Sequence, residues 1–465
     1  MNESRRIIHL CIFMCCLFLT VCGYLTWFVL SPPPEVENSP YDTRQWAAEQ
    51  QQERGRFLDR KGTVLADNTE DGTRRYPYGA LYTHLIGYSS RTYGRTLLES
   101  SCNAQLLNLQ TGNISDVLGM LSTERRGADI TLTVDHDLQQ YAASRLGSQR
   151  GAVVALDPAT GEVLALYSNP SFDPNLSALN ENFSALAEDT EAAPFLSRAL
   201  NGRYAPGSTF KVITAAAALE EGLDDFTFSD TEGTAEFDGF EIRNFGGNAY
   251  GELDLATAFE KSSNTAFATL GQELGYGKLL KTAEAFGFNT TARFDLQVAD
   301  PTAPKTVQNK GELAQTAIGQ GNLLTTPLAM AQVAATVANN GKRMQPYLVA
   351  ETVYPNGIAI RSAPKSEGRA VSEETAQTLQ EWMKNVVTRG TGTAARSSIG
   401  IAGKTGTAQN EREDRDHAWF IGFAPADEPN IAVCVLLEYA GRTGGEAAAP
   451  IARDIMVRWQ TLRKN

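Results

Sequence analysis

The segment YAPGSTFK, residues 204–211, holds the side chains best placed for covalent chemistry. Ser208 and Lys211 are three positions apart, so they share one helix face and their side chains can meet. Pro206 and Gly207 break the incoming chain and leave the pair in a first turn, where free N–H groups favour negative charge. A serine becomes nucleophilic when a base takes its proton, and a lysine can do this only when it is uncharged. The apolar VITAAAAL that follows predicts a half-buried setting that would lower the pKa of Lys211.

The spacing S-x-x-K is loose by itself. A second copy, SAPK at 362–365, contains a proline that argues against a helix. Taken alone, Ser208 could be a helix N-cap and Lys211 a solvated helix residue. The interpretation as a reactive pair therefore depends on what accompanies it.

Two further polar segments accompany the pair. KSSNTAF places Ser262, Ser263 and Asn264 in a polar break between two helical patterns. A similar triplet, SCN at 101–103, lies upstream of the serine–lysine pair in a different part of the chain.

The other segment, AGKTGTAQ, contains the only K-T-G of the sequence, on a predicted strand. Thr405 and Thr407 are two apart, so both hydroxyls project to one side and can bind one carboxylate. Gly406 would leave the strand edge open to an extended peptide. Lys404 adds positive charge for that carboxylate, although the chain as a whole is acidic.

The elements that must position these segments alternate between strand and helix patterns. Helical patterns cover residues 136–147, 208–221, 252–270, 326–340 and 447–462. Strand patterns cover 151–156, 162–168, 398–409, 417–425 and 430–440. Strands near both ends with helices between them predict an α/β layer fold whose sheet combines both ends.

The N-terminal region differs from the rest. Residues 7–30 contain no Asp, Glu, Lys or Arg, and as a helix they would span about 36 Å, enough to cross a bilayer. Arg5 and Arg6 precede this run, so the positive-inside rule leaves residues 1–6 in the cytoplasm and the remainder outside. A cleaved signal peptide is the alternative, but the run is long and no A-x-A-like site follows. A lipoprotein site at Cys22 is disfavoured because valine precedes the cysteine.

The net charge of −13 and the absence of long Lys/Arg runs argue against nucleic acid as a partner. Four of the six cysteines lie within residues 7–30, so we expect no disulfide framework. Four scattered histidines predict no metal site.

S-x-x-K, S-x-N and K-T-G in this order resemble the motifs of class B penicillin-binding proteins, which are monofunctional peptidoglycan D,D-transpeptidases. In its length, the chain resembles the group of these proteins that has a short pedestal. The resemblance covers nearly the whole chain and includes the segments 54–66, 151–175, 317–331 and 417–425. One departure is Leu97 in YGRTLLE, where the family's pedestal usually has a glycine, which puts the local pedestal geometry in question.

The resemblance implies a serine β-lactamase-like transpeptidase domain over 128–465, an antiparallel sheet flanked by helices. It also implies a transmembrane helix at 7–30 and a linker with a small strand-rich pedestal, akin to a dimerisation module, at 31–127. SPPPEVENSP at 31–40 predicts a stiff spacer. The protein would be a single-pass protein of a bacterial plasma membrane.

The catalytic roles that the resemblance implies fall on four residues. Ser208 would attack the carbonyl between the two terminal D-alanines of a donor stem peptide, and Lys211 would be its base. Ser262, helped by Lys404, would pass a proton to the departing D-alanine. The amine of a second stem peptide would then resolve the acyl-enzyme and form a cross-link.

The implied substrate-binding residues are Asn264, Thr405, Gly406 and Thr407. Asn264 would hold the substrate amide and Lys211. The backbone N–H groups of Ser208 and Thr407 would form the oxyanion hole. No cofactor is implied.

The resemblance further implies cell-wall synthesis in division or elongation, covalent inhibition by β-lactams and a SEDS-type membrane glycan polymerase as partner. A β-lactamase is the enzymatic alternative, but no E-x-x-L-N segment lies between Ser262 and Lys404 to position water. A non-catalytic scaffold or β-lactam sensor on the same fold is the other. Three intact motifs disfavour the scaffold, and a six-residue cytoplasmic tail disfavours the sensor.

Overall fold

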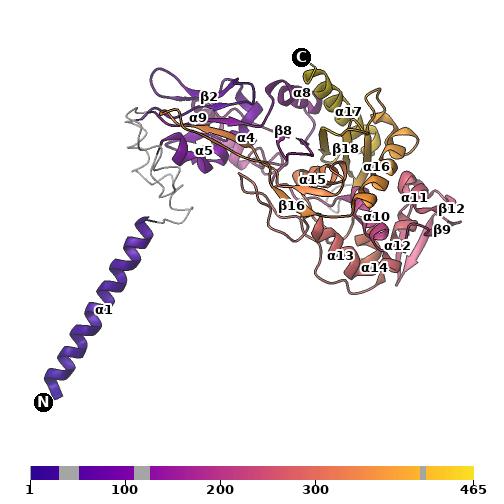
Figure 1. Ribbon diagram of the computed structural model, residues 1–465, viewed down its shortest axis with the longest axis horizontal. Helices are drawn as coiled ribbons and strands as arrows, with labels where there is room; N and C mark the ends of the chain where they lie inside the picture. The colour runs from indigo at the N-terminus through magenta and orange to yellow at the C-terminus, as the bar shows by residue number, and fades with distance from the viewer. Residues whose placement is uncertain (1, 31–51, 109–125, 409–414, 465) are drawn as a thin grey trace.

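The structure is a computed structural model that describes residues 2–30, 52–108, 126–408 and 415–464. The spacer expected at 31–40 lies outside the described residues, as do parts of the expected pedestal. The N-terminal segment forms one continuous helix, α1 (Asn2–Leu30), seen at the N-terminal end in Figure 1. Within the described residues, α1 supplies the one helix long and apolar enough to cross a membrane, over Arg5–Phe28.

A five-stranded antiparallel sheet forms the centre of the larger body, in the order β17–β18–β19–β7–β8. Its strands come from two distant parts of the sequence, as predicted. They are β7 (Gly151–Leu156), β8 (Val163–Asn169), β17 (Ala402–Ala408), β18 (His417–Ala424) and β19 (Ile431–Leu437). The strand that carries K-T-G, β17, is at the edge of this sheet.

Helices cover both faces of this sheet, which explains why its strands are almost continuously apolar. On one face, Val154 and Leu156 join a core that includes α10 and α15. On the other, Val153 and Ala155 pack in a second core with α8 and α17. The bounds are α8 (His136–Leu146), α10 (Lys211–Glu220), α15 (Pro327–Ala338) and α17 (Gly444–Leu462).

Further helices surround the motif segments. The polar break predicted at residues 262–264, inside the helical pattern 252–270, separates two helices. The elements are α11 (Leu255–Lys261), α12 (Asn264–Leu274), α13 (Tyr276–Ala285), α14 (Lys310–Ala317) and α16 (Glu373–Thr388). Two short antiparallel pairs precede α11. One is the hairpin of β10 (Thr234–Phe237) and β11 (Phe240–Arg243), and the other pairs β9 (Thr227–Asp230) with β12 (Gly251–Asp254) on either side of that hairpin.

The pedestal is built on a six-stranded sheet in the order β15–β14–β6–β1–β2–β3. Two of its strands come from residues 349–361, far along the chain, and run beside the N-terminal ones, as the long orange segments in Figure 1 show. The bounds are β1 (Phe57–Leu58), β2 (Val64–Asn68), β3 (Arg74–Arg75), β6 (Asp129–Leu132), β14 (Val349–Val353) and β15 (Ala359–Arg361). The pedestal and the larger body are therefore not consecutive stretches of sequence.

Leu97, the departure noted above, begins the short helix α5 (Leu97–Ser101) with a φ of +48°. A left-handed conformation costs a non-glycine residue about 1–2 kcal/mol. The side chain of Leu97 packs against the main core, which offsets part of this cost. The pedestal thus keeps a backbone suited to glycine although the residue is leucine.

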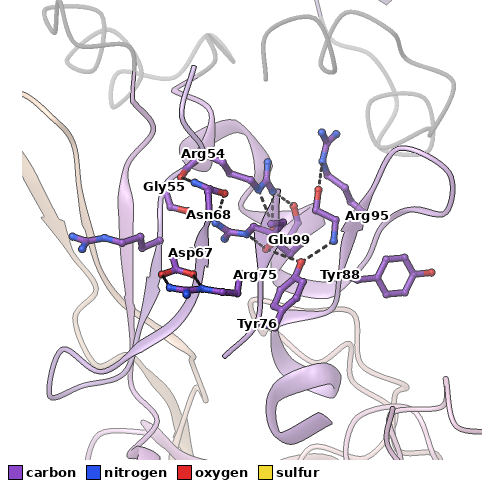
Figure 2. A network of polar contacts seen from close by, with 12 residues as sticks. Arg54, Gly55, Asp67, Asn68, Arg75, Tyr76, Tyr88, Arg95 and Glu99 are labelled. Atoms are coloured by element: carbon purple, nitrogen blue, oxygen red, sulfur yellow. Dashed lines mark hydrogen bonds and ion pairs between the residues drawn. The ribbon is translucent and has the colours of Figure 1, made fainter. Parts of the chain in front are cut away.

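A buried ion cluster links the elements of the pedestal (Figure 2). Glu99 is fully buried and accepts hydrogen bonds from Arg54 Nε at 2.7 Å, Arg74 Nε at 2.6 Å and the Tyr76 hydroxyl at 3.1 Å. Burial alone would raise the pKa of Glu99, but the charges of Arg54 and Arg74 outweigh it and lower the pKa to about 2. The carboxylate therefore stays ionised between two buried cations.

Replacing Glu99 by Gln should destabilise the chain strongly, because two buried arginines lose their counter-charge. We expect the free energy of unfolding at pH 7 to fall by about 3–5 kcal/mol, measured by denaturant unfolding of the detergent-solubilised protein. The difference from the parent should shrink as the pH falls from 4.5 towards 2, where Glu99 itself becomes protonated. Asp67→Asn, which breaks the more exposed pair with Arg75, is the control and should cost under about 1 kcal/mol. Equal losses in the two variants would contradict this account.

Candidate active site

The nucleophile segment begins with a 3₁₀ turn, η2 (Gly207–Phe210), and continues directly into α10. Ser208 lies in this turn, half-buried, and the N-cap of α10 is Phe210. Lys211 is the first residue of α10 and has no exposed surface. The alternative of a capping serine beside a solvated lysine is therefore wrong.

Lys211 donates hydrogen bonds to neutral oxygens of the S-x-N segment. Its Nζ lies 2.7 Å from the carbonyl oxygen of Ser262, 2.7 Å from Asn264 Oδ1 and 3.4 Å from Ser262 Oγ. Burial, with a smaller contribution from the charge of Lys404, lowers the pKa of Lys211 well below its usual value. An amine in this setting can be uncharged near neutral pH and accept a proton.

Lys404 approaches the same serine from β17. Its Nζ donates to Ser262 Oγ at 2.8 Å and to the carbonyl oxygen of Thr405 at 3.1 Å. The side chain has no exposed surface, and burial lowers its pKa to about 7. The hydroxyl of Ser262 thus lies between two lysine amines, an arrangement able to relay a proton.

Ser262 occupies a strained position between α11 and α12. Its φ of +57° and ψ of 38° are left-handed, which costs a serine of the order of 1–3 kcal/mol. The adjacent backbone is fixed by Asn244, a 3%-exposed residue whose Oδ1 accepts from Asn264 N at 2.7 Å and Thr265 N at 3.1 Å. Sequence reasoning missed Asn244, because no local pattern connects it to a segment twenty residues away.

The carboxamide of Asn264 is held at both ends. Its Oδ1 accepts from Lys211, and its Nδ2 donates to the carbonyl oxygen of Arg243 at 2.7 Å. Ser263, the residue between the two motif side chains, caps α12 by accepting from Ala266 N. The S-x-N segment is therefore rigidly seated beneath the groove.

The K-T-G strand lies against the nucleophile segment. A Cβ on Gly406 would be 2.9 Å from Thr209 Cγ2 and 3.1 Å from the carbonyl oxygen of Pro206. The glycine thus makes room for the nucleophile segment, which is a different reason from the open strand edge expected above. Thr405 Oγ1 shares a hydrogen bond with Thr391 Oγ1 at 2.6 Å.

A groove of about 690 Å³ joins the three motifs. Five of the eight predicted site residues line it: Ser208, Ser262, Asn264, Thr405 and Thr407. Of the other three, Lys211 and Lys404 are buried and contact Ser262, and Gly406 is buried between Thr405 and Thr407 in β17. Charged and aromatic groove residues that sequence reasoning missed are Glu241, Arg243, Phe245, Tyr250, Lys261, Asp416 and Glu446.

Residues 151–457 match the family model of the penicillin-binding protein transpeptidase domain. The chain belongs to this family. Residues 54–130 of this penicillin-binding protein also match the model of the penicillin-binding protein A dimerisation domain. The family and the fold class predicted from the motifs are both confirmed.

Individual relatives agree with this assignment. Peptidoglycan D,D-transpeptidase PbpA of Mycolicibacterium smegmatis is 39% identical over 427 residues, covering 84% of this chain and 85% of the relative. The ceftriaxone acyl-enzyme complex of penicillin-binding protein A from M. tuberculosis superimposes with a TM-score of 0.81 and 34% identity, over 88% of this chain and 98% of that one. The D,D-transpeptidase domain of a peptidoglycan glycosyltransferase from Eggerthella lenta gives a TM-score of 0.79 and 36% identity, over 89% and 100%.

Replacing Lys404 by Met should stabilise this penicillin-binding protein, and more so at low pH. An unfolded lysine keeps its proton below 10.5, whereas the folded amine loses it above about 7, so parental stability rises as the pH rises through that interval. We expect the advantage of the variant in unfolding free energy to be about 3 kcal/mol larger at pH 6 than at pH 9.

Denaturant unfolding at the two pH values measures this difference. Lys278→Met, which removes a half-exposed lysine paired with Glu221, is the control. It should change the unfolding free energy by the same amount at the two pH values. An advantage of Lys404→Met that does not change with pH would contradict a buried, proton-poor amine.

Proposed function

We propose that this protein is a membrane-anchored peptidoglycan D,D-transpeptidase of class B, acting through an acyl-enzyme at Ser208. The observation that carries the proposal is the pair of fully buried lysines, Lys211 and Lys404, whose amines both reach Ser262. Burying two cations beside one hydroxyl costs stability and has no structural benefit that an apolar pair would lack. Such a site is the kind that enzymes keep for proton transfer.

Acylation begins when Lys211, in its uncharged form, takes the proton of Ser208. The Ser208 oxygen then bonds to the carbonyl carbon between the two D-alanines of the donor stem peptide. The backbone N–H groups of Ser208 and Thr407 stabilise the oxyanion, an effect worth about 3–4 kcal/mol in comparable enzymes. The C–N bond breaks, and D-alanine leaves with a proton relayed through Ser262, with Lys404 next to it.

The K-T-G strand orients the donor. The hydroxyls of Thr405 and Thr407 bind the terminal carboxylate, and both residues line the groove. Lys404 lies beneath them, so its positive form attracts the same carboxylate. Asn264, already bonded to Lys211, holds the substrate amide.

The acyl-enzyme is resolved by the amine of a second stem peptide, which forms the cross-link and frees Ser208. A β-lactam presents its strained amide to the same serine and stays attached as the ring opens. The M. tuberculosis relatives, solved as ceftriaxone and imipenem acyl-enzyme complexes, support covalent inhibition of this chain. The role is cell-wall synthesis.

The N-terminal region is the part of the chain to which we assign the membrane anchor and the contact with a partner. With Arg5 and Arg6 on the cytoplasmic side, α1 crosses the plasma membrane and the groove lies on the extracytoplasmic side. The linker and pedestal over 31–127 and the transpeptidase domain over 128–465, which also contributes β6, β14 and β15 to the pedestal sheet, then lie outside. A SEDS-type membrane glycan polymerase would bind α1 and the pedestal, a proposal that rests on family resemblance.

Incubation with a fluorescent penicillin should label the parent once, and Ser208→Ala should abolish the label because no nucleophile remains. Mass spectrometry of the digested parent should locate the adduct on the peptide that contains Ser208. Ser362→Ala, in the exposed SAPK segment, is the matched control and should label like the parent.

An adduct elsewhere, or an unlabelled but folded parent, would contradict the assignment. Nitrocefin should be opened in about one equivalent and then only slowly, because no group is assigned to deliver water to the acyl-enzyme. Sustained rapid turnover would favour the β-lactamase alternative. Full growth support by Ser208→Ala in a strain lacking the parent would favour a scaffold.

A further inference from the structure

Glu438 follows β19 and its carboxylate is nearly buried, with 5% of the side chain exposed. Its Oε1 accepts hydrogen bonds from the Tyr204 hydroxyl at 2.5 Å and from Arg198 Nε at 3.0 Å. Arg150 Nε donates to the other oxygen, also at 3.0 Å. Tyr204 and Arg198 are 8% and 1% exposed. A buried, doubly ion-paired carboxylate thus binds the residue that opens the nucleophile segment, 234 positions away.

We propose that Tyr204 and Glu438 are positioning residues for the acylation of Ser208. Their hydrogen bond fixes the start of the segment 204–208 and so sets where the nucleophile lies above the K-T-G strand. The inference rests on the proposed function, since it concerns the same acylation step.

Tyr204 is held from several other sides, which makes it a fixed point and not a loose surface residue. Its backbone N donates to the carbonyl oxygen of Thr325 at 3.0 Å, and Thr325 N donates back at 2.8 Å. The ring meets His417 and Trp419 of β18 edge-on, with centroids 5.4 and 6.1 Å apart. Gly202 leaves the space for the hydroxyl, because a Cβ there would lie 2.3 Å from it.

The backbone between Tyr204 and Ser208 is held by close contacts. Gly207 N donates to the carbonyl oxygen of Gly319 at 2.9 Å, and a Cβ on Gly207 would lie 2.7 Å from the carbonyl oxygen of Thr407. The backbone just before Ser208 therefore touches the strand that supplies the second oxyanion donor. A movement of Tyr204 would be passed on to Ser208, and a misplacement of about 1 Å can reduce a rate about 100-fold.

The pedestal provides a structural counterpart with the same chemistry (Figure 2). There the Tyr76 hydroxyl donates to Glu99, which Arg54 and Arg74 hold in place. Tyr76 is 4% exposed, close to the exposure of Tyr204. Loss of either hydroxyl removes a hydrogen bond to a buried carboxylate, and loss of the Tyr76 hydroxyl also removes the bond that it accepts from Ser89 N at 2.8 Å. Only Tyr204 belongs to the nucleophile segment.

Tyr204→Phe, made in the full-length protein, tests the inference. Stopped-flow acylation by nitrocefin separates the dissociation constant of the initial complex from the acylation rate constant. We expect the acylation rate constant to fall about tenfold and the dissociation constant to stay within about twofold, because positioning affects the reacting geometry and not ground-state binding. The shape of its pH profile should stay parental, since no proton-transfer group has changed.

Tyr76→Phe is the matched control. Both variants should lower the melting temperature by a few degrees, since each removes a hydrogen bond to a buried carboxylate. Tyr76→Phe should nevertheless keep the parental acylation rate constant. A parental rate constant in Tyr204→Phe, or equal reductions in the two variants, would overturn the inference.

Glu438→Gln and the double variant with Tyr204→Phe show whether the hydroxyl acts through the carboxylate. We expect Glu438→Gln to slow acylation with little change in the dissociation constant, and the double variant to be no slower than the slower single one. If the double variant were slowed by the product of the two single reductions in the acylation rate constant, the inference would be overturned. A parent that is not acylated at Ser208 would refute the proposed function itself. A Tyr204→Phe variant with the parental acylation rate constant would refute only the positioning role.

Discussion

The structure depends on excluding water from two lysine amines that lie beside the hydroxyl of Ser262. Lys211 and Lys404 have no exposed surface, and both donate to Ser262. Burial favours the uncharged form of each, and only an uncharged amine can accept a proton. Water admitted between η2, β17 and the α11–α12 junction would restore the charges and remove that capacity. Close packing of three distant segments is therefore a chemical requirement of the site.

That packing explains several local features that otherwise look unfavourable. Ser262 adopts a left-handed backbone, and this puts its hydroxyl between the amines. Gly207 and Gly406 have no Cβ where the nucleophile segment meets β17, so the two backbones can touch. Asn244 uses one buried oxygen to hold the N-terminus of α12 in place. Each feature removes freedom from a side chain or backbone group that must be in place before substrate arrives.

The sequence allowed the family, the sheet with flanking helices and the residues that meet at the groove to be predicted. Those predictions worked because Ser208 and Lys211 lie on one turn, and because strands buried on both sides are continuously apolar. The remainder depends on contacts without local pattern. Glu438 contacts Tyr204 across 234 positions, and β14 and β15 join the pedestal from residues 349–361, more than 200 positions after β6. The close approach of Thr209 and Pro206 to Gly406 could not be predicted, because only the folded chain shows which neighbours lie where a Cβ would be.

Acid should affect the site and the pedestal at different pH values, because their buried groups have different pKa values. Lys404 has a pKa of about 7, so mild acid charges an amine that the site holds in a dry environment. Glu99 has a pKa of about 2 and stays ionised between Arg54 and Arg74 far below that pH. The buried lysines lower the stability of the folded state under mild acid, while the buried carboxylate still contributes its full share. Mild acid thus charges Lys404 at a pH where the ionic contacts that hold the pedestal together are still intact.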